Sequence, residues 1–499
     1  MSRLMFIEDE WVKSSDGRSL NVFDPSTGKV MDTVPHASRD DARKAVDAAR
    51  DAFDRGVWSK MPPGGRANLL FKVADLLDQN SQEFIRLEAS NAGKTLKQVT
   101  YYDWLGVIDS IRFLAGASRI LEGKAMAEYA AEGTSAIRRD PVGVVACITP
   151  WNYPLMLGLQ RTIPALAMGN TVVVKPPSYT PLTLIELARI TQKAGLPKGV
   201  LNVVTGPGAE VGEELATHPG VDMISFTGST EVGRRLMELG SRTVKKISLE
   251  LGGKAPFIVF GDADIEAAVR GGVVGGLLNN AQECGAATRF YIHESIFDKY
   301  IKRLIEELDK VKIGPSLDMK TDLGPLVSET QRKTIESYIT KGVEQGGRIL
   351  RGGKRPNILG YEDGYYVEPT VIQTENHDSA IVTEEIFGPV LTMLKFNNYE
   401  EVIKKSNSVI YGLTSSVWTK DVTTAIRATR DLRAGTVWVN EHFSTMPVEM
   451  PWGGCKQSGT GVEASMYSLE ECTNIKHVYF DISGTQRRSW HFAVYGQKG

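Results

Sequence analysis

One of four cysteines has the surroundings of a nucleophile. Cysteines stand at 147, 284, 455 and 472, and no two form a C-x-x-C pair. Cys284 lies at what the pattern predicts is a helix end, in Gln282-Glu283-Cys284-Gly285-Ala286, where small neighbours leave room for a substrate at sulfur. A thiolate there could form a covalent intermediate. A lone cysteine is more often inert than catalytic, so its partners must decide.

Glu250 and Asn152 are candidate partners of that nucleophile. Glu250 ends an apolar run before Gly252-Gly253-Lys254. A partly desolvated carboxylate has a raised pKa suited to a general base, whereas a glutamate turned to solvent does not. Asn152 is held between Pro150 and Pro154, where its amide could donate to an oxyanion or simply form an Asx turn.

Two further segments could hold phosphate or ribose groups. In the segment from Phe226 to Gly233, an apolar strand pattern runs through Gly228-Ser229 into a helix, whose free N–H groups could bind phosphate. The spacing is not G-x-G-x-x-G, and on this segment alone an ordinary Ser/Thr N-cap after a strand is the better explanation. Lys175 ends another strand pattern, where ligands of parallel sheets bind, although most strand-end lysines are only solvated.

Strand and helix patterns alternate around these residues from Pro141 onward. Strands are predicted at 143–148, 171–175, 200–204, 223–226 and 246–249, with helices near 156–168, 181–194, 209–217 and 230–240. This alternation indicates βαβ units and a parallel sheet. Before it come a strand at 5–12 and helices over 40–121; after it come a second α/β block and a final strand at 474–482.

Composition excludes several classes of protein. The 499 residues are 42% hydrophobic and 24% charged, with a formal net charge of −2, which argues against a disordered chain and against nucleic-acid or membrane-surface binding. Sparse cysteines indicate a reducing compartment without a disulfide framework or a zinc module, and no metal is expected. The uncharged stretch 141–160 contains prolines and polar residues that disfavour a spanning helix. We expect a soluble, cytoplasmic protein with a small-molecule partner.

Taken together, the motifs resemble those of the aldehyde dehydrogenase superfamily. They occur in that family's order: Thr149-Pro150-Trp151-Asn152, Lys175-Pro176, Phe226-Thr227-Gly228-Ser229, Leu249-Glu250-Leu251-Gly252-Gly253-Lys254, Gln282-Glu283-Cys284, Glu384-Glu385-Ile386-Phe387-Gly388-Pro389 and Pro451-Trp452-Gly453-Gly454. The resemblance implies an α/β fold with a Rossmann-like cofactor domain, an α/β catalytic domain and a small β oligomerisation extension. It places the cofactor domain at 1–121 with 142–251, the catalytic domain at 252–469 and the extension at 122–141 with 470–499. It also implies a homodimer or homotetramer.

The resemblance also assigns roles. Cys284 would attack the aldehyde, Asn152 and the Cys284 N–H would hold the oxyanion, and Glu250 would activate the water that hydrolyses the thioester. NADP or NAD would accept the hydride. The implied cofactor-binding residues are Ile148, Thr149, Pro150, Trp151, Lys175, Ser178, Gly208, Phe226, Gly228, Ser229, Gly233, Leu251, Glu385 and Phe387.

Two departures bear on specificity. Many NAD-preferring relatives carry a glutamate three residues after the strand-end lysine; here Ser178 stands there, so we expect NADP to be preferred. Tyr153, Asp103 and Trp452 resemble the substrate site of the branch that oxidises aminoaldehydes and betaine aldehyde. Gln160 and Leu278 replace aromatic residues of that cage, which leaves semialdehydes, hydroxyaldehydes and aliphatic aldehydes as alternatives.

Three other functions stay open from the sequence. A CoA-acylating enzyme would not need a water-activating base, and Glu250 argues against it. A structural relative without activity predicts loss of the nucleophile, yet Cys284 is present. A nucleotide-binding module without chemistry is the most distant alternative.

Overall fold

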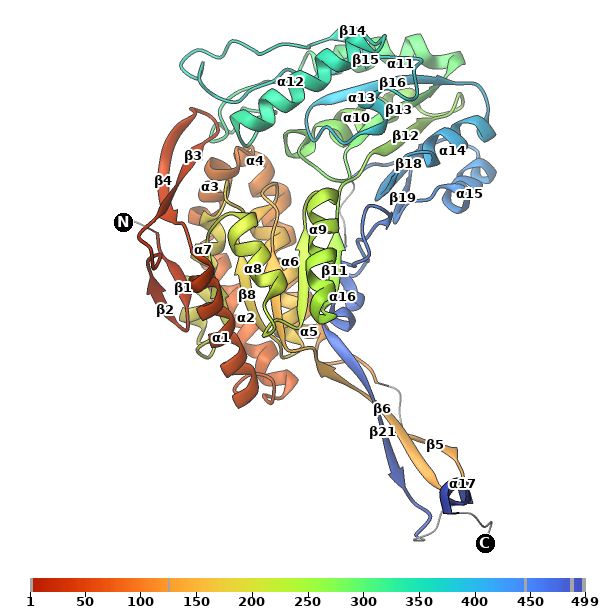
Figure 1. The fold of residues 1–499 in the computed structure, drawn as a ribbon. Coiled ribbons are helices and arrows are strands. Elements are labelled where there is room, and N and C mark those ends of the chain that lie inside the picture. Colours follow the sequence, from red (N-terminus) through yellow and green to blue (C-terminus); the bar gives the residue numbers. More distant parts are fainter. Residues whose placement is uncertain (1–2, 124–125, 444–446, 485–488, 496–499) are drawn as a thin grey trace.

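The computed structural model describes residues 3–123, 126–443, 447–484 and 489–495, and these form two α/β lobes and a projecting arm (Figure 1). Each lobe is built on a seven-stranded sheet. The α/β class and the β extension predicted from the sequence are confirmed. The domain boundaries at 121, 251 and 469 stay a prediction.

The first lobe has a largely parallel sheet in the order β11-β10-β7-β8-β9-β1-β2. Its five parallel strands lie within two residues of the predicted positions: β7 Val144–Ile148, β8 Thr171–Lys175, β9 Leu201–Val203, β10 Met223–Thr227 and β11 Lys246–Glu250. The chain order reverses between β7 and β10. Ligands bind at the carboxyl ends of strands at such a switch point.

The N-terminal strand predicted at 5–12 is wrong in one respect. It is a hairpin of β1 Met5–Ile7 and β2 Glu10–Val12, joined antiparallel through Glu8 and Asp9. Both turn residues have left-handed backbone, with φ of 54° and 70°. Two such residues make the two-residue turn that fits the twist of a hairpin. A second hairpin, β3 Ser19–Asp24 with β4 Lys29–Pro35, follows.

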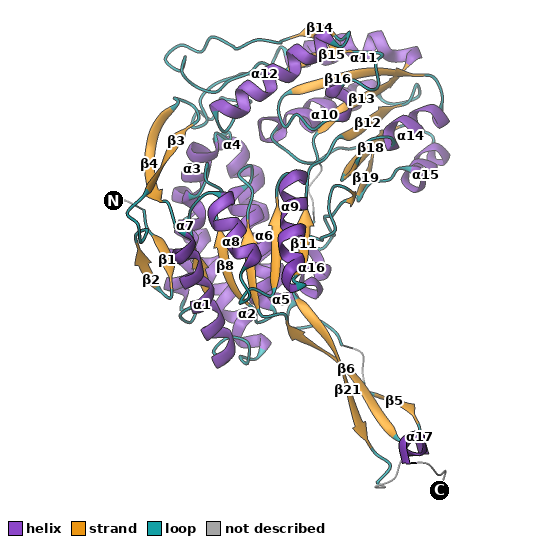
Figure 2. Cartoon of the chain, viewed as in Figure 1, coloured by secondary structure: helices purple, strands orange, loops and turns teal. Residues whose placement is uncertain are grey.

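Helices cover both faces of the first sheet (Figure 2). Side chains of β7 and β8 alternate between two cores: Val145, Cys147, Val172 and Val174 face one, and Val144, Ala146 and Val173 face the other. This alternation is what a strand buried on both sides requires. The helices of this lobe are α1 Arg39–Arg55, α2 Pro63–Gln79, α3 Ser81–Ala92, α4 Leu96–Gln98, the π-turn η1 Val99–Asp103, α5 Trp104–Ala117, α6 Pro154–Ala167, α7 Leu182–Ala194, η2 Gly208–Gly212, α8 Glu213–Thr217, α9 Thr230–Gly240 and η3 Ser241–Thr243.

The second lobe has a sheet in the order β14-β15-β16-β13-β12-β18-β19, parallel except at β14. Its strands are β12 Ala255–Val259, β13 Ala287–His293, β14 Arg348–Arg351, β15 Thr370–Gln373, β16 Val390–Phe396, β18 Thr414–Trp418 and β19 Thr436–Val439, with a separate pair β17 Tyr411–Gly412 and β20 Cys455–Lys456. Its helices are α10 Ile265–Leu277, η4 Leu278–Ala281, η5 Glu294–Ile296, α11 Phe297–Leu308, α12 Glu329–Glu344, α13 Ala380–Thr383, α14 Tyr399–Asn407 and α15 Val422–Asp431.

The end of the chain returns to the first lobe. Helix α16 (Ser465–Glu471) packs against α5 and α6 of that lobe, although the predicted catalytic domain contains most of it. Leu469 and Cys472 join the first lobe's core. The return brings the carboxylate of Glu463 to Thr227 of β10 and that of Glu471 to Ser248 of β11.

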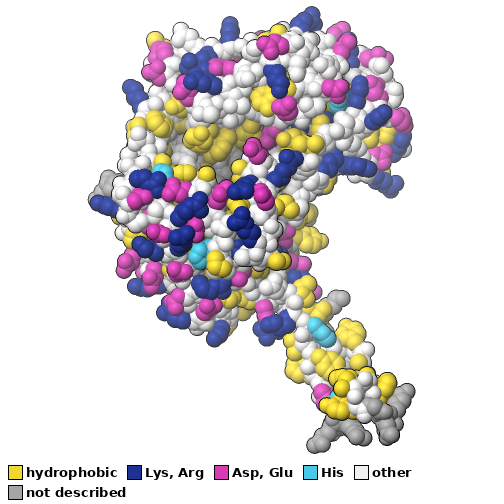
Figure 3. Space-filling model, viewed as in Figure 1, with side chains coloured by type: hydrophobic (Ala, Val, Ile, Leu, Met, Phe, Trp, Pro, Cys, Tyr) yellow, Lys and Arg dark blue, Asp and Glu magenta, His cyan; other side chains and the backbone are white. Residues whose placement is uncertain are grey.

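The arm is a three-stranded antiparallel sheet in the order β21-β6-β5. Its strands are β5 Ala127–Ala130, β6 Gly133–Pro141 and β21 Thr473–Asp481, and η6 Ser489–His491 with α17 Phe492–Tyr495 lie at its tip. It projects from the lobes, and hydrophobic side chains gather on it (Figure 3). They include Tyr129, Ile475, Tyr479, Phe480 and Ile482, all exposed.

Candidate active site

The loop that carries Cys284 is held by buried amides. Helix α10 ends at Leu277, and Asn279, Asn280 and Ala281 follow in left-handed conformation, with φ of 56°, 56° and 60°. The Asn279 amide donates to Asn152 O and Gln282 O, each at 2.9 Å, and the Asn280 amide donates to Gly93 O at 2.8 Å. The predicted helix end at Cys284 is therefore wrong. Helix α10 ends at Leu277, seven residues earlier, and left-handed residues follow it.

Asn152 lies directly beside this loop. Its side chain is buried, and Nδ2 donates to Gln282 O at 3.0 Å. The segment before it is tied to the sheet, since Thr149 N donates to Lys175 O at 3.2 Å. The first lobe thus places the Asn152 amide next to the backbone of the loop that carries Cys284.

Aromatic side chains surround Cys284 on the second lobe. The half-buried Cys284 packs with Leu278 and Trp438 against a cluster of Leu413, Phe443 and Trp452. Gly285 has no room for a side chain, because a Cβ there would lie 2.9 Å from Trp452 and 3.1 Å from Phe443. The neighbouring residues therefore have to be small for the rings to approach the thiol.

Glu283 is the carboxylate that contacts the thiol. Cys284 Sγ donates to Glu283 Oε1 at 3.3 Å, and Gly285 N donates to the same oxygen at 3.3 Å. Burial, followed by the charge of Glu283, raises the pKa of the Cys284 thiol well above its usual range. Burial also raises the pKa of Glu283, while Tyr153, Cys284, the Gly285 N–H and Lys94 oppose that rise.

Glu250 is buried, with 2% of its surface exposed, at the carboxyl end of β11. Among the described residues, neither of its carboxylate oxygens has a hydrogen-bond partner. Burial and then the nearby Glu463 carboxylate raise its pKa well above the usual range, against the opposing charge of Arg161. This is the environment of a carboxylate that can accept a proton near neutral pH.

Arg161, Glu463 and Glu250 form a buried group that we name the Arg161 cluster. Arg161 Nε lies 2.7 Å from Glu463 Oε1, and the guanidinium donates to Thr227 Oγ1 at 2.8 Å and to Ser248 Oγ at 3.0 Å. Thr227 Oγ1 in turn donates to Glu463 at 2.6 Å. The cation is paired with Glu463, which leaves Glu250 as the unpaired carboxylate.

Lys94, Asp103 and Glu283 form a second group, the Lys94 cluster, in which Lys94 and Asp103 are buried. Lys94 Nζ lies 2.5 Å from Asp103 Oδ2 and 3.3 Å from the centroid of the Tyr153 ring, and only 1% of the lysine is exposed. Two of the three predicted substrate residues, Tyr153 and Asp103, are therefore already bound to a cation of the chain itself. Trp452, the third, lies beside the nucleophile loop.

The predicted cofactor residues gather at the switch point between β7 and β10. Ile148 ends β7, and Phe226 lies in β10 just before Gly228. Ser229 caps α9 by accepting from Val232 N at 3.4 Å, so the end of that helix presents N–H groups at the sheet edge. Gly233 fits closely against Leu251, since a Cβ there would lie 2.6 Å from the leucine.

Lys175 and Ser178 lie at the carboxyl end of β8. Lys175 is buried, its Nζ donates to Pro176 O at 2.8 Å, and burial lowers its pKa to about 8. Ser178 Oγ donates to Gly206 O at 3.2 Å. Gly208 opens the η2 turn nearby, with open space where a Cβ would stand.

Glu385 and Phe387 come from the second lobe, and Phe387 meets Trp151 of the first lobe. Gly253 N donates to Glu385 Oε1 at 2.8 Å, and burial raises the pKa of this carboxyl to about 7. The Phe387 ring packs edge-on against Trp151 with centroids 5.1 Å apart. A carboxylate, a buried ammonium, a helix N-terminus and an aromatic ring suit the hydroxyl, phosphate and ring groups of a dinucleotide, so these residues fit such a cofactor.

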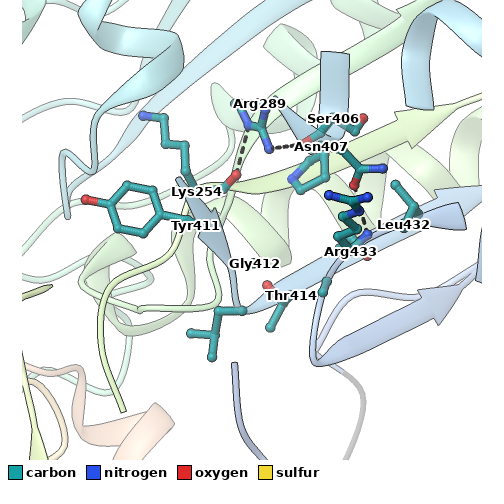
Figure 4. A pocket seen from close by; sticks show the side chains of 13 residues that line it. Lys254, Arg289, Ser406, Asn407, Tyr411, Gly412, Thr414, Leu432 and Arg433 are labelled. Carbon is teal, nitrogen blue, oxygen red and sulfur yellow. Dashed lines mark hydrogen bonds between the residues drawn. The ribbon is translucent and has the colours of Figure 1, made fainter. Parts of the chain in front are cut away.

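A small cavity in the second lobe is lined by Lys254, Arg289, Tyr411 and Arg433, among others (Figure 4). Lys254 Nζ is buried without a hydrogen-bond partner among the described residues. Burial and then Arg289 lower the pKa of Lys254 to about 7, while Glu385 opposes this. Lys254 therefore belongs to the groups that set the charge at Glu385.

Sequence reasoning missed four of the charged groups at this site: Lys94, Arg161, Glu283 and Glu463. Glu283 carried a signal, since it stands next to the candidate nucleophile. Arg161 stands on an apolar helix that packs on the sheet, and Lys94 follows Gly93 at the end of another helix. A charge at a position that must be buried was the available indication.

The described residues contain neither a membrane-spanning helix nor a cluster of metal-binding side chains. No helix there is long and apolar enough to cross a membrane. No group of three or more His, Cys, Asp or Glu side chains in that part of the chain could hold a metal ion.

Comparison with known proteins gives the family. A model of the aldehyde dehydrogenase family matches residues 11–478. The betaine aldehyde dehydrogenase of Bacillus subtilis (strain 168) is 41% identical over 96% of this chain and 97% of its own length. The phenylacetaldehyde dehydrogenase of Pseudomonas fluorescens is 38% identical over 95% of this chain and 94% of its own.

A solved structure supports the same family assignment. The betaine aldehyde dehydrogenase from Staphylococcus aureus in complex with NAD⁺ matches with a TM-score of 0.95 and 38% identity, over 98% of this chain and 96% of that one. Relatives with different substrates are thus about equally similar, and the likeness fixes the reaction class but not the aldehyde. The chain belongs to the aldehyde dehydrogenase family and is an NAD(P)-dependent oxidoreductase.

Proposed function

We propose that this enzyme oxidises an aldehyde to a carboxylic acid through a thioester on Cys284, which water then hydrolyses. The observation that carries the proposal is Glu250, a buried carboxylate without a hydrogen-bond partner among the described residues and with a raised pKa. Such a group can take a proton from water. The CoA-acylating alternative gives no reason to keep an unpaired buried acid, which costs stability.

The residues of this chain would act in sequence. Cys284 Sγ attacks the aldehyde carbon, and the Asn152 amide with the Cys284 N–H hold the oxyanion that forms. When bound, NAD(P)⁺ accepts the hydride that leaves this carbon. Glu250 then takes a proton from the water that attacks the thioester, and the Cys284 thiolate leaves. Glu385 and Lys175 bind and orient the two riboses of the cofactor.

The test is NAD(P)H formation with an aldehyde panel, with product analysis for the free acid. Wild-type enzyme should form acid without CoA, and C284A should lose turnover by about 10⁴-fold or more, as removal of a covalent nucleophile does. C147A is the matched control, because Cys147 is buried in β7 away from the nucleophile loop. Acid formation only on addition of CoA would contradict the proposal.

We infer that a cationic aldehyde, an aminoaldehyde or betaine aldehyde, is preferred. Carboxylates outnumber cations around the thiol, since Glu283, Glu385 and Glu463 all act on the Cys284 pKa. The nearby cation Lys94 is paired with Asp103. Because Lys94 occupies one face of the Tyr153 ring, a substrate cation would use the other face together with Trp452. A carboxylate-bearing semialdehyde would meet like charge.

A kcat/KM panel tests the substrate class. We expect 4-aminobutanal or betaine aldehyde to exceed a neutral alkanal of the same length, and succinic semialdehyde to be the poorest. Higher kcat/KM for the anionic or neutral members would contradict the inference and favour a semialdehyde or aliphatic aldehyde dehydrogenase.

We propose further that NADP is preferred over NAD. A serine at 178 puts no carboxylate against a 2′-phosphate, and the Lys175 ammonium stands three residues earlier on the same strand end. The S178E variant is the control: it should lower kcat/KM for NADP by more than tenfold and change that for NAD much less. A wild-type kcat/KM that is much higher with NAD would contradict this proposal.

We propose that the arm joins copies of this chain into a homodimer or homotetramer. Its exposed apolar side chains support this, because a lone copy would leave them in water. Sedimentation should give a dimer or tetramer at micromolar concentration. A Y479K/F480K variant should shift the protein toward monomer, and a monomeric wild type would contradict the proposal.

A further inference from the structure

Glu283 is a charged side chain at the nucleophile that the proposed reaction has not used. It immediately precedes Cys284, and its Oε1 accepts the thiol proton's hydrogen bond at 3.3 Å. The same oxygen accepts from Gly285 N at 3.3 Å, which fixes the carboxylate on the side of the sulfur. Sulfur and carboxylate therefore share one proton in the resting enzyme.

The groups around the Cys284 thiol and the Glu283 carboxylate favour one negative charge in total on these two side chains. Lys94, from the turn after α3, opposes the rise in the pKa of Glu283 that burial causes. Tyr153, before α6, also lowers it, and its hydroxyl is buried. Tyr102 of η1 interacts with Glu283, Asp103 acts on Tyr153, and Glu463 and Glu385 act on Cys284. A proton moved from sulfur to carboxylate leaves the total charge unchanged.

We propose that Glu283 is a second catalytic carboxylate, which takes the thiol proton from Cys284 as sulfur attacks. The S–H bond breaks, the proton goes to Glu283 Oε1, the S–C bond forms, and the carbonyl electron pair moves to the carbonyl oxygen. Glu283 holds this proton through acylation and returns it to the Cys284 thiolate that leaves in hydrolysis, and Glu250 gives the proton of the hydrolytic water to solvent. This step rests on the proposed aldehyde chemistry, but the proton transfer itself needs no aldehyde.

Glu250 does not explain the same step. Among the described residues no hydrogen bond joins Glu250 to Cys284, whereas Glu283 has one. The two carboxylates thus divide the reaction: Glu283 takes the proton that acylation releases from sulfur, and Glu250 takes the proton of the hydrolytic water.

The alternative to a base is that Glu283 acts only as a fixed negative charge. The two roles predict opposite changes in the reaction rate of Cys284 when the carboxylate is removed. As a fixed negative charge only, Glu283 would hold the thiol protonated, so that removing the charge would lower the Cys284 pKa and speed its reactions. As a base, its removal would slow the reactions of sulfur, typically by 10²- to 10⁴-fold.

The experiment is the rate of Cys284 alkylation by iodoacetamide in wild type and E283Q between pH 6 and 9, followed by mass analysis of the Cys284 peptide. Iodoacetamide is uncharged, so a role of Glu283 in binding a substrate cation does not affect the rate. We expect alkylation below pH 8 to fall at least tenfold in E283Q. E384Q, at an exposed neighbour of Glu385, should leave the rate unchanged. An equal or faster rate in E283Q overturns the proposal.

A second variant, E283A, tests the proposal if E283Q does not fold. E283A leaves a space that formate can enter, and added formate should then speed Cys284 alkylation in E283A but not in wild type. Absence of this rescue in a folded E283A overturns the proposal. Loss of NAD(P)H formation by wild-type enzyme would instead count against the proposed function, because alkylation is measured without aldehyde or cofactor.

Discussion

The Arg161 and Lys94 clusters are built alike, yet they leave their unpaired carboxylates in different states. Each holds one cation, one carboxylate paired with it and one carboxylate left over. In the Arg161 cluster the remaining acid, Glu250, has no hydrogen bond among the described residues. In the Lys94 cluster the remaining acid, Glu283, accepts from the nucleophile.

The difference follows from the two cations. The guanidinium of Arg161 is a fork that bonds Thr227 and Ser248 besides Glu463, so its hydrogen bonds go to groups other than Glu250. The Lys94 ammonium is a point charge between Asp103 and the Tyr153 ring. We conclude that pairing one acid firmly is what leaves the second acid free for chemistry.

The largest effect should come from removing the unpaired acid of the Arg161 cluster. E250Q should lower steady-state kcat by about 10²- to 10⁴-fold, because the thioester is no longer hydrolysed efficiently. Rapid mixing should still give a burst of about one NAD(P)H per site, since acylation uses Cys284 and Glu283. A lost burst in E250Q would break the assignment of the two acids to two steps.

The next effect is on the stability of the folded protein, and it compares the cations Arg161 and Lys94. R161M and K94M should each lower the free energy of unfolding by about 3–5 kcal/mol, because each leaves a buried carboxylate unpaired. R161M should be the more severe, since hydroxyl partners are also lost. Urea unfolding at pH 7.5 measures both.

The matched control for that comparison is the double variant K94M/D103L. Removing both charges of the pair should recover most of the stability that K94M loses. If the double variant were as unstable as K94M, the ion pair would not be what holds the Lys94 cluster together.

A smaller effect is the pH dependence of stability that Glu250 causes. Its pKa is raised in the folded state, so the folded enzyme binds more protons than the unfolded chain once the pH exceeds about 4.5. Stability therefore falls as the pH rises from there to the raised pKa, by about 1.4 kcal/mol for each pH unit between the two values. E250Q should remove this slope and be relatively more stable at pH 8. Equal slopes for E250Q and wild type, from Tm against pH, would contradict the buried, unpaired state of Glu250.

The smallest effect should come from a hydroxyl that supports the Arg161 fork. Ser248 Oγ accepts from Arg161 and donates to Glu471 at 2.7 Å. S248A should cost about 1–2 kcal/mol in the free energy of unfolding and leave the alkylation rate of Cys284 unchanged. A change in alkylation would mean that the two clusters are coupled.

Much of the fold was predictable because its signals are local. The strands β7, β8, β10 and β11 repeat β-branched and apolar residues that suit burial on both faces, and turns separate them from amphipathic helices. The N-terminal hairpin was not predicted, since Glu8 and Asp9 are not the usual residues for left-handed turn positions. The position of Cys284 outside a helix also escaped, because Asn279 and Asn280 make their bonds to segments far away in sequence.

The sequence by itself predicted the family and the candidate reaction centres Cys284, Glu250 and Asn152, because the motifs that carry them resemble those of one family in order and spacing. Only the tertiary structure decided which charges pair. Lys94 pairs with Asp103 and lies over the Tyr153 ring, and the proposed role of Glu283 rests on its contact with the thiol. The physical reason is that burial, which decides whether a charge needs a partner, comes from segments that are distant in sequence: Arg161 pairs with Glu463, and Lys94 lies over the Tyr153 ring.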